Sequence, residues 1–302
     1  MNEMVERILE LKKEKDVVIL AHYYVTGDIQ DIADYVGDSY LLSKKAAEAS
    51  EKVILFCGVE FMGESAKILS PDKTVLLPDL EADCPMAHMV TPEDIRKLKK
   101  ECPDAAVVCY INSTAETKAW ADVCVTSSNA ERVVAAMPQR EIYFVPDSNL
   151  GRHIAEKLPE KTFYFHNGFC PTHARISEAL VRKAKEDHPG AKVLMHPECI
   201  PDALALADYI GSTSGIIDFP GKDDGDSYII ATEEGVMHQM KKQYPDKAFY
   251  MVDDLCICEN MKKNTLEKIL YTLETFDNTM EMDEELRVQA SRSLKKMHEL
   301  AQ

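Results

Sequence analysis

The sequence lacks an excess of basic residues. Its 302 residues include 35 lysines and arginines against 52 aspartates and glutamates, which gives a formal net charge of −17. Binding to nucleic acid or to an anionic membrane requires a basic surface, so the composition disfavours both classes of partner. The acidic balance also opposes long-range attraction of anionic substrates. Such substrates would have to be held by local groups, such as histidines, hydroxyls and helix N-termini.

Long apolar runs are absent as well. The longest, such as residues 53–59, have the length of a strand and fall far short of the ~20 residues that span a bilayer. The opening MNEMVERILELKKEKD shows an amphipathic helical pattern and lacks the basic-then-apolar plan of a signal peptide. We therefore expect a cytoplasmic protein whose nine cysteines serve as core residues, metal ligands or catalysts rather than as disulfides.

An internal repeat runs through the chain instead. Short apolar runs rich in β-branched residues alternate with helical stretches, a pattern typical of parallel sheets covered by helices. Ala-Asp pairs begin at residues 33, 121 and 207, with separations of 88 and 86 residues, and each leads towards a hydroxyl-rich turn. The strands around these pairs keep the same separations. Several landmarks in one register indicate copies of a single unit.

These observations predict an α/β protein made of three homologous α/β/α (three-layer sandwich) repeats around a pseudo-threefold axis, with a central active site. Each unit should have about three or four strands. The predicted repeats are residues 15–101, 102–187 and 188–262, and the terminal segments 1–14 and 263–302 are expected to form helices that pack on them. Within the second terminal segment, residues 265–276 and 283–302 are amphipathic.

Polar side chains stand where one strand of each repeat ends. The corresponding pairs are His22 and Tyr24, Tyr110 and Asn112, and His196 and Glu198, and the hydroxyl-rich turns add Ser39, Ser127, Ser212 and Thr213. Functional groups of parallel α/β units gather at the carboxyl ends of strands, so a threefold arrangement would bring these side chains to one cavity. Any one of them alone is more often structural, but three corresponding polar ends favour a shared pocket.

Glu198 is the favoured general acid or base of this set. A carboxylate in a closed site can have its pKa raised towards neutrality, which suits proton transfer. The alternative role is that of a helix-capping residue beside Pro197.

Three of the nine cysteines also occupy corresponding places. Cys84, Cys170 and Cys258 each follow the last strand of a repeat, and Pro171 predicts a helix start that would favour a thiolate at Cys170. Zinc sites usually show Cys-x2-Cys pairs, which this chain lacks. Three isolated thiolates suit a 4Fe-4S cluster with one iron lacking a protein ligand, and such an iron is a Lewis acid suited to dehydration. Cys256 competes with Cys258 as the third ligand, and the register leaves that choice open.

The chain as a whole resembles the quinolinate synthase family, the A protein of bacterial and archaeal de novo NAD biosynthesis. The matching segments are AHYYVTGDIQDIADYVGDS, CGVEFMGESAKIL, DLEADCPMAHM, YINSTAETKAWADVCVTSSNA, VPDSNLG, HPEC, GSTSGI and CENMKKNTLEKI. The resemblance implies a triangular arrangement of three α/β/α repeats. It also implies a transferase that condenses iminoaspartate with dihydroxyacetone phosphate, giving quinolinate, inorganic phosphate and two waters.

The resemblance implies roles for single residues as well. The family's cluster is a 4Fe-4S centre with three cysteine ligands, which match Cys84, Cys170 and Cys258. The last ligand stands three residues before a methionine and six before an asparagine, here Met261 and Asn264, which selects Cys258 over Cys256. The unligated iron would take the hydroxyl that leaves as water. Binders of the substrate carboxylates and phosphate would be His22, Ser39, Ser127, His196, Ser212 and Thr213.

Proton transfer would fall to Tyr24, Tyr110 and Glu198, with His196 counted among the catalytic residues and Asn112 orienting the substrate. Tyr110 and Glu198 would also contact the substrate. His88, His166 and His173 lie near the cysteines, and we expect them in solvent rather than around the cluster. A transient contact with aspartate oxidase or aspartate dehydrogenase would deliver the iminoaspartate.

Two other functions compete with this interpretation. The iron-sulfur subunit that starts diphthamide synthesis has a similar architecture, takes one cysteine from each of three units and cleaves S-adenosylmethionine. An electron carrier or iron-sulfur sensor is the second alternative. The polar strand ends HYY, YIN and HPE favour quinolinate formation over both, because a carrier or sensor does not need polar groups around an open iron.

Overall fold

The computed structural model describes residues 3–301, so residues 1, 2 and 302 of the predicted terminal segments lie outside it. The first lobe contains the strands β1 (Val17–His22), β2 (Tyr35–Gly37), β3 (Val53–Cys57) and β4 (Thr74–Leu76). Its helices are α1 (Glu3–Glu14), α2 (Gly27–Ile32), α3 (Ser39–Glu48), α4 (Glu60–Leu69) and the short 3-10 helix η1 (Pro85–His88).

The second lobe follows with the strands β5 (Ala106–Tyr110), β6 (Val123–Val125), β7 (Glu141–Val145) and β8 (Thr162–Phe165). Its helices are α5 (Pro92–Glu101), α6 (Ala115–Trp120), α7 (Ala130–Ala136) and α8 (Ser148–Lys157), and α9 (Pro171–Ala174) leads into the next lobe.

The third lobe contains β9 (Lys192–Met195), β10 (Tyr209–Ile210), β11 (Ser227–Ala231) and β12 (Ala248–Met251). Its helices are α10 (Glu178–Asp187), α11 (Pro201–Leu204), α12 (Thr213–Asp218), η2 (Phe219–Gly221) and α13 (Val236–Gln243). The short 3-10 helix η3 (Met261–Lys263) follows and packs against the first lobe, where Met261 joins its apolar core. The chain ends with α14 (Leu266–Thr275) and α15 (Glu284–Leu300).

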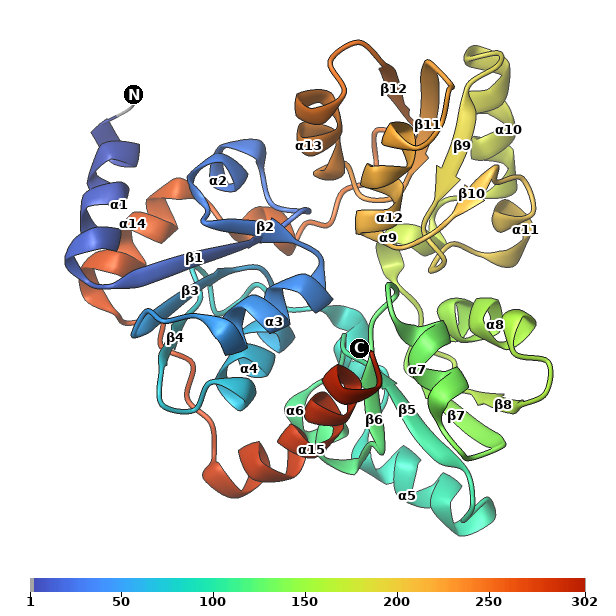
Figure 1. Cartoon of the computed structure of the whole chain (residues 1–302), viewed down its shortest axis with the longest axis horizontal. Helices are drawn as coiled ribbons and strands as arrows, with labels where there is room; N and C mark the ends of the chain where they lie inside the picture. Colours follow the sequence, from blue (N-terminus) through green and yellow to red (C-terminus); the bar gives the residue numbers. More distant parts are fainter. Residues whose placement is uncertain (1–2, 302) are drawn as a thin grey trace.

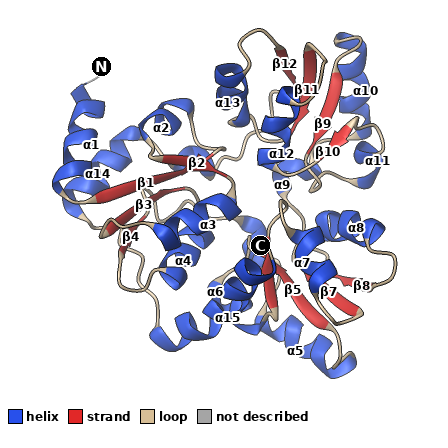
Figure 2. Cartoon of the chain, in the orientation of Figure 1, coloured by secondary structure: helices blue, strands red, loops and turns tan. Residues whose placement is uncertain are grey.

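The three lobes share one topology. Their sheets have the strand orders β2-β1-β3-β4, β6-β5-β7-β8 and β10-β9-β11-β12, and every pairing within them is parallel. Helices lie on both faces of each sheet, and the three lobes surround a common centre (Figures 1 and 2). All six residues of β1 are buried, as expected of a strand covered on both sides. The structure confirms the predicted α/β class and the expected number of strands per unit.

The core is not divided equally among the lobes. One continuous cluster of buried apolar side chains joins the first lobe, the second lobe and the last two helices. Two smaller clusters lie in the third lobe. The first two lobes are therefore joined by a shared apolar core, whereas the third lobe has cores of its own.

The last two helices form where the sequence predicts them. Thr265 and Asp283 cap their N-termini by accepting hydrogen bonds from backbone N–H groups of the first turn. Helix α14 packs against α1 on the first lobe, and α15 packs against α4 of the first lobe and α6 of the second. The cap predicted at Thr91 is also present, with Pro92 at the first position of α5.

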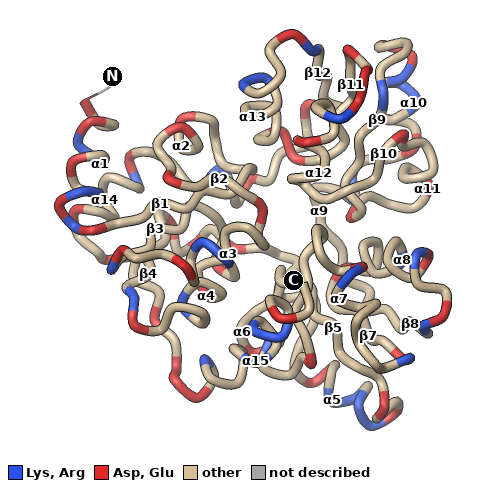
Figure 3. Tube along the Cα trace, viewed as in Figure 1, with Lys and Arg blue, Asp and Glu red and all other residues tan. Residues whose placement is uncertain are grey.

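Acidic residues are spread over the outer helices and loops of all three lobes rather than gathered in one patch (Figure 3). Within residues 3–301, no helix combines the length and the apolar content that crossing a membrane requires.

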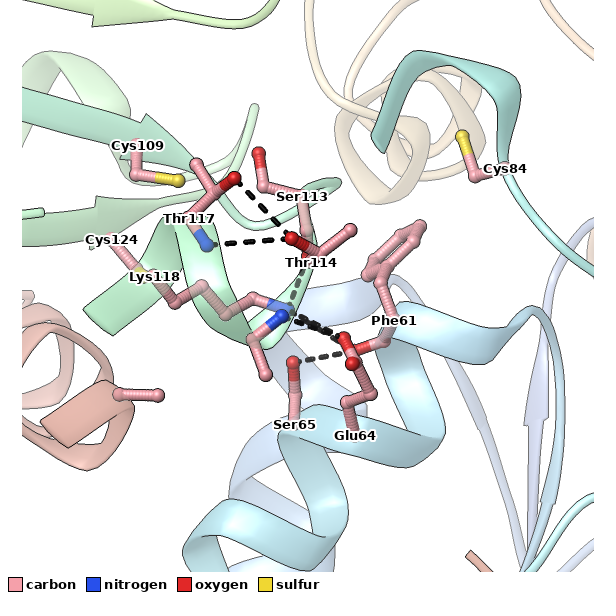
Figure 4. A network of polar contacts seen from close by, with 12 residues as sticks. Phe61, Glu64, Ser65, Cys84, Cys109, Ser113, Thr114, Thr117, Lys118 and Cys124 are labelled. Atoms are coloured by element: carbon pink, nitrogen blue, oxygen red, sulfur yellow. Dashed lines mark hydrogen bonds and ion pairs between the residues drawn. The ribbon is translucent and has the colours of Figure 1, made fainter. Parts of the chain in front are cut away.

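A buried lysine ties the first lobe to the second. Lys118 on α6 is fully buried, and its Nζ donates to the carbonyl oxygens of Ser113 at 2.7 Å and Phe61 at 3.3 Å (Figure 4). The same Nζ lies 3.9 Å from a carboxylate oxygen of Glu64 on α4. That oxygen also accepts the backbone N–H of Ala115, the first residue of α6. Because Ser113 directly follows Asn112, this network also fixes one of the polar strand ends.

Replacing Lys118 with Met should destabilise the protein by about 3 kcal/mol, because it leaves the carbonyl oxygens of Ser113 and Phe61 without their donor and removes the cation that holds down the pKa of Glu64. The measurement is denaturant unfolding of the metal-free protein. The double variant K118M/E64Q should recover part of the loss, since it removes the orphaned charge as well. Equal stability of K118M and wild type would show that the pair contributes nothing to joining the lobes.

Candidate active site

The polar strand ends of all three lobes meet in one pocket of about 640 Å³. The predicted site residues that line it are His22, Tyr24, Ser39, Cys84, Tyr110, Asn112, Ser127, Cys170, His196, Glu198, Thr213 and Cys258. The structure therefore brings these predicted side chains together in one pocket, and the roles assigned to them stay predictions.

Ser212 is the one predicted site residue that does not line the pocket. Its hydroxyl accepts the backbone N–H of Gly215 at 3.2 Å and so caps α12. Its neighbour Thr213 does reach the pocket, where its hydroxyl lies 3.0 Å from the hydroxyl of Tyr24.

Two histidines present the same ring nitrogen to the pocket. The backbone N–H of Tyr24 donates to Nδ1 of His22 at 3.2 Å, and that of Glu198 donates to Nδ1 of His196 at 3.4 Å. Burial lowers the pKa of each histidine to about 3, so both rings are neutral. With Nδ1 accepting, the proton resides on Nε2, which in His196 donates to the hydroxyl of Ser127 at 3.3 Å. Each ring is thus neutral, is held in place through Nδ1 and can donate a hydrogen bond through Nε2.

Glu198 lies at the centre of a buried cluster. One carboxylate oxygen is 2.7 Å from Nδ1 of His173 and 3.4 Å from Nδ1 of His196. Burial opposes ionisation of this carboxyl, whereas hydrogen bonds from His173 and from the hydroxyl of Tyr110 favour it and lower its pKa. These partners oppose the rise in the pKa of Glu198 that the sequence predicts. Sequence reasoning counted the burial but could not see these donors.

His173 is the residue that sequence reasoning misplaced. It is fully buried rather than in solvent, and its Nε2 lies 2.8 Å from the hydroxyl of Thr232. The Thr232 hydroxyl in turn lies 3.0 Å from that of Tyr24. A hydrogen-bonded chain thus connects Glu198 to Tyr24. The spacing of His173, three residues after Cys170 across a helix start, could have placed both side chains on one face of that turn.

The two tyrosines of the pocket are poor acids here. Burial and the nearby Glu198 raise the pKa of Tyr24 and of Tyr110 well above the ordinary value. Both hydroxyls therefore keep their protons at neutral pH and can donate them in hydrogen bonds.

Two buried acceptors in the pocket have no partner. Oδ1 of Asn112 and Oε1 of Glu198 make no hydrogen bond to any part of the chain that the structure describes. Buried polar atoms are nearly always paired, so each such atom calls for an explanation. Their position in the pocket indicates that a bound molecule supplies the missing donors.

The three repeat cysteines share this pocket. Cys84 follows the first sheet, Cys170 the second and Cys258 the third, and the thiols are close enough to disfavour one another's ionisation. Burial raises the pKa of all three, that of Cys84 to about 12, so the predicted thiolate at Cys170 is wrong for the metal-free protein. Helix α9 does begin at Pro171 as predicted, but its four residues give too small a dipole to offset burial.

Cys256 lies elsewhere. It is 3% exposed, packs in a core of the third lobe and does not line the pocket. Its backbone oxygen accepts the N–H of Glu234 at 2.9 Å. Its position thus favours Cys258 over Cys256 as the third ligand, because only Cys258 shares a pocket with Cys84 and Cys170.

Three thiols from three lobes in one pocket fit a 4Fe-4S cluster with three protein ligands. Cys170, His173 and Glu198 also bring potential ligand atoms within 4.8 Å of one another. In that second set, however, Nδ1 of His173 is already hydrogen-bonded, at 3.2 Å from the sulfur of Cys170 and 2.7 Å from Glu198. The cysteine set therefore fits a metal centre better.

The remaining two histidines stay away from the pocket lining. His88 is exposed and bonded to Asp83 at 2.6 Å, as expected of a solvated residue. His166 is partly buried, between the hydroxyl of Tyr143 and the carbonyl of Met89.

The chain is similar over nearly its whole length to known proteins. The model of the family described as quinolinate synthetase A protein matches residues 6–299. A quinolinate synthase of Clostridium perfringens strain SM101 is 51% identical over 295 residues, covering 98% of each chain. Those of Caldicellulosiruptor bescii and Clostridioides difficile are 50% and 48% identical, covering 97% and 99% of each chain. With near-complete coverage at this identity, the chain belongs to the quinolinate synthetase A family.

Proposed function

We propose that this protein is a quinolinate synthase of NAD biosynthesis, which condenses iminoaspartate with dihydroxyacetone phosphate and releases phosphate and two waters. The observation that carries the proposal is one pocket in which a cysteine from each of three lobes meets Tyr24, Tyr110 and Glu198. Cys84, Cys170 and Cys258 would hold a 4Fe-4S cluster. When bound, that cluster supplies a Lewis-acidic iron with an open coordination position.

Neutral donors would hold the anionic groups of the substrates. Nε2–H of His22 and of His196 is the protonated nitrogen of each ring, and the hydroxyls of Ser39, Ser127 and Thr213 line the same pocket. Ser39 is also the first residue of the ten-residue helix α3, where backbone N–H groups favour negative charge. Local donors thus offset the repulsion that an acidic protein exerts on carboxylates and phosphate.

Proton transfer would run along the buried path of hydrogen bonds that connects Glu198 to Tyr24. Glu198 would accept a proton from the substrate at its unpaired oxygen, and Tyr24 and Tyr110 would hold their hydroxyl protons in hydrogen bonds to the substrate until negative charge develops there. His173 and Thr232 join Glu198 to Tyr24, so a proton taken at one end can be replaced at the other. The unpaired Oδ1 of Asn112 would accept a hydrogen bond from the substrate and orient it.

We further infer that the three repeats, predicted as residues 15–101, 102–187 and 188–262, are copies of one unit related by a pseudo-threefold axis, with 1–14 and 263–302 as terminal additions. The boundaries lie about ten residues earlier than predicted, because α5 contacts α6 of the second lobe and α10 contacts α11 of the third. The support is the identical strand order of the three sheets. A cytoplasmic location is proposed from the composition alone. Transient delivery of iminoaspartate by aspartate oxidase or aspartate dehydrogenase is likewise part of this proposal.

The test is an anaerobic assay of the purified, cluster-loaded protein. It should be brown and should form quinolinate from iminoaspartate plus dihydroxyacetone phosphate, measured by chromatography against authentic quinolinate. A loaded sample that forms no quinolinate but cleaves S-adenosylmethionine would overturn the proposal in favour of diphthamide-type chemistry. A sample that does neither but exchanges electrons would indicate a carrier or a sensor.

A further inference from the structure

The backbone N–H groups of two cysteines in the pocket donate to fully buried carboxylates. The N–H of Cys170 donates to Oδ2 of Asp147 at 3.1 Å, and that of Cys258 donates to Oε1 of Glu233 at 3.0 Å. Both carboxylates have no exposed surface. Each reaches a cysteine loop about 25 residues further along the chain, so these contacts fix the position of the loop against the sheet.

Asp147 and Glu233 occupy corresponding places in the repeat. Asp147 lies two residues after the end of β7 and Glu233 two residues after the end of β11, and they are 86 residues apart, the separation of the second and third copies. The corresponding residue after β3 is Val59, which has no acceptor. In the first lobe, the N–H of Cys84 instead donates to the side chain of its own neighbour, Asp83, at 2.6 Å.

Each buried carboxylate uses both of its oxygens as acceptors. The second oxygen of Asp147 accepts the N–H of Leu150 at 2.7 Å, and that of Glu233 accepts the N–H of Gly235 at 2.7 Å. An amide of the same shape has only one oxygen, so its NH₂ group would face a backbone N–H. Asn or Gln therefore cannot make both contacts, and Gln at position 233 would also lose the ion pair between Oε1 and Nζ of Lys262, at 2.9 Å.

We propose that Asp147 and Glu233 are positioning residues for the metal centre, which hold the loops of Cys170 and Cys258 so that two of the three thiols face the pocket before any metal is bound. This inference rests on the proposed function, since it concerns the cluster that Cys84, Cys170 and Cys258 would hold. It predicts that cluster retention depends on two side chains that donate no ligand atom. Partners of this kind around metal ligands strengthen metal binding because they fix the orientation of the ligand.

The experiment measures how fast reconstituted protein loses its cluster to an iron chelator under anaerobic conditions, followed by the visible absorbance of the cluster and by iron and sulfide content. Asp147→Asn and Glu233→Gln should each lose the cluster about ten- to a hundredfold faster than wild type. The matched control is Asp283→Asn, which changes a helix-capping aspartate on α15 whose Oδ1 accepts the N–H of Leu286 at 3.0 Å. The control should stay within about twofold of wild type.

Circular dichroism of the metal-free variants separates positioning from folding. Asp147 also caps α8, whereas Glu233 caps no helix, so Glu233→Gln carries the test alone if Asp147→Asn fails to fold. Wild-type rates of loss in both variants would overturn the proposal, and so would the loss of folded metal-free protein in both, which would make these carboxylates structural. A wild-type chain that takes up no iron and sulfide would instead overturn the proposed function itself.

Discussion

Replacing Glu198 with Gln is expected to abolish quinolinate formation while leaving the cluster in place. The carboxylate is fully enclosed, is held by His173 at 2.7 Å and keeps one oxygen unpaired in the pocket. Gln preserves the shape but cannot accept a proton at neutral pH. General acid–base groups typically contribute about 10²–10⁴ in rate, and we expect kcat to fall by at least that range. The measurement is quinolinate formation by anaerobic protein of known cluster content.

A matched control for this variant is Glu160→Gln, the same change at an exposed residue outside the pocket. Its turnover should equal that of wild type. Loss of the cluster from Glu198→Gln would show that Glu198 is structural, and normal turnover would remove it from the catalytic set.

Replacing Cys258 with Ala should prevent stable cluster binding, whereas Cys256→Ala should retain the cluster. Only Cys258 lines the pocket with Cys84 and Cys170, and Cys256 is packed into a separate apolar core. A centre left with two thiolates loses a ligand that no neighbouring cysteine can replace. We expect near-complete loss of visible absorbance, iron and activity in the first variant, measured after identical anaerobic reconstitution.

Each of these two variants is the control for the other, because both remove a thiol from the same three-residue segment. Cys256→Ala should lose at most about 1–2 kcal/mol of stability, since Ala leaves only a small gap in its core. If Cys256→Ala loses the cluster and Cys258→Ala keeps it, the ligand set is wrong.

Much of the architecture could be predicted because the repeat is a property of the sequence itself. Polar residues at the carboxyl ends of parallel strands lie at one edge of their sheet. Tyr24, Tyr110 and Glu198 could therefore be placed near one pocket from the sequence alone. The same register placed Cys84, Cys170 and Cys258 after the last strand of each repeat, so their approach to one another could also be predicted.

The prediction that failed concerns a residue whose position is fixed by contacts between segments distant in the chain. His173 was expected in solvent because a histidine after a proline gives no sign of its partners, whereas its place is fixed by Thr232, 59 residues away. The partners of Glu198 are likewise distant in the chain, since His173 lies 25 residues before it. Ser212 does not line the pocket and caps α12 instead, so its predicted role in substrate binding stays a prediction.

The unequal distribution of the apolar core also makes the interfaces between the lobes different. The first and second lobes share one apolar core, so parting them would expose that core to water, which is unfavourable. The third lobe meets the first through many polar contacts, among them Ser214 to Asp38, Gln30 to the carbonyl of Gly235, and Lys262 to the carbonyl of Tyr24. Water can replace such contacts at small net cost. Parting the third lobe from the other two would therefore cost less free energy than parting the first two, and it would carry Glu198 away from Tyr24 and Tyr110.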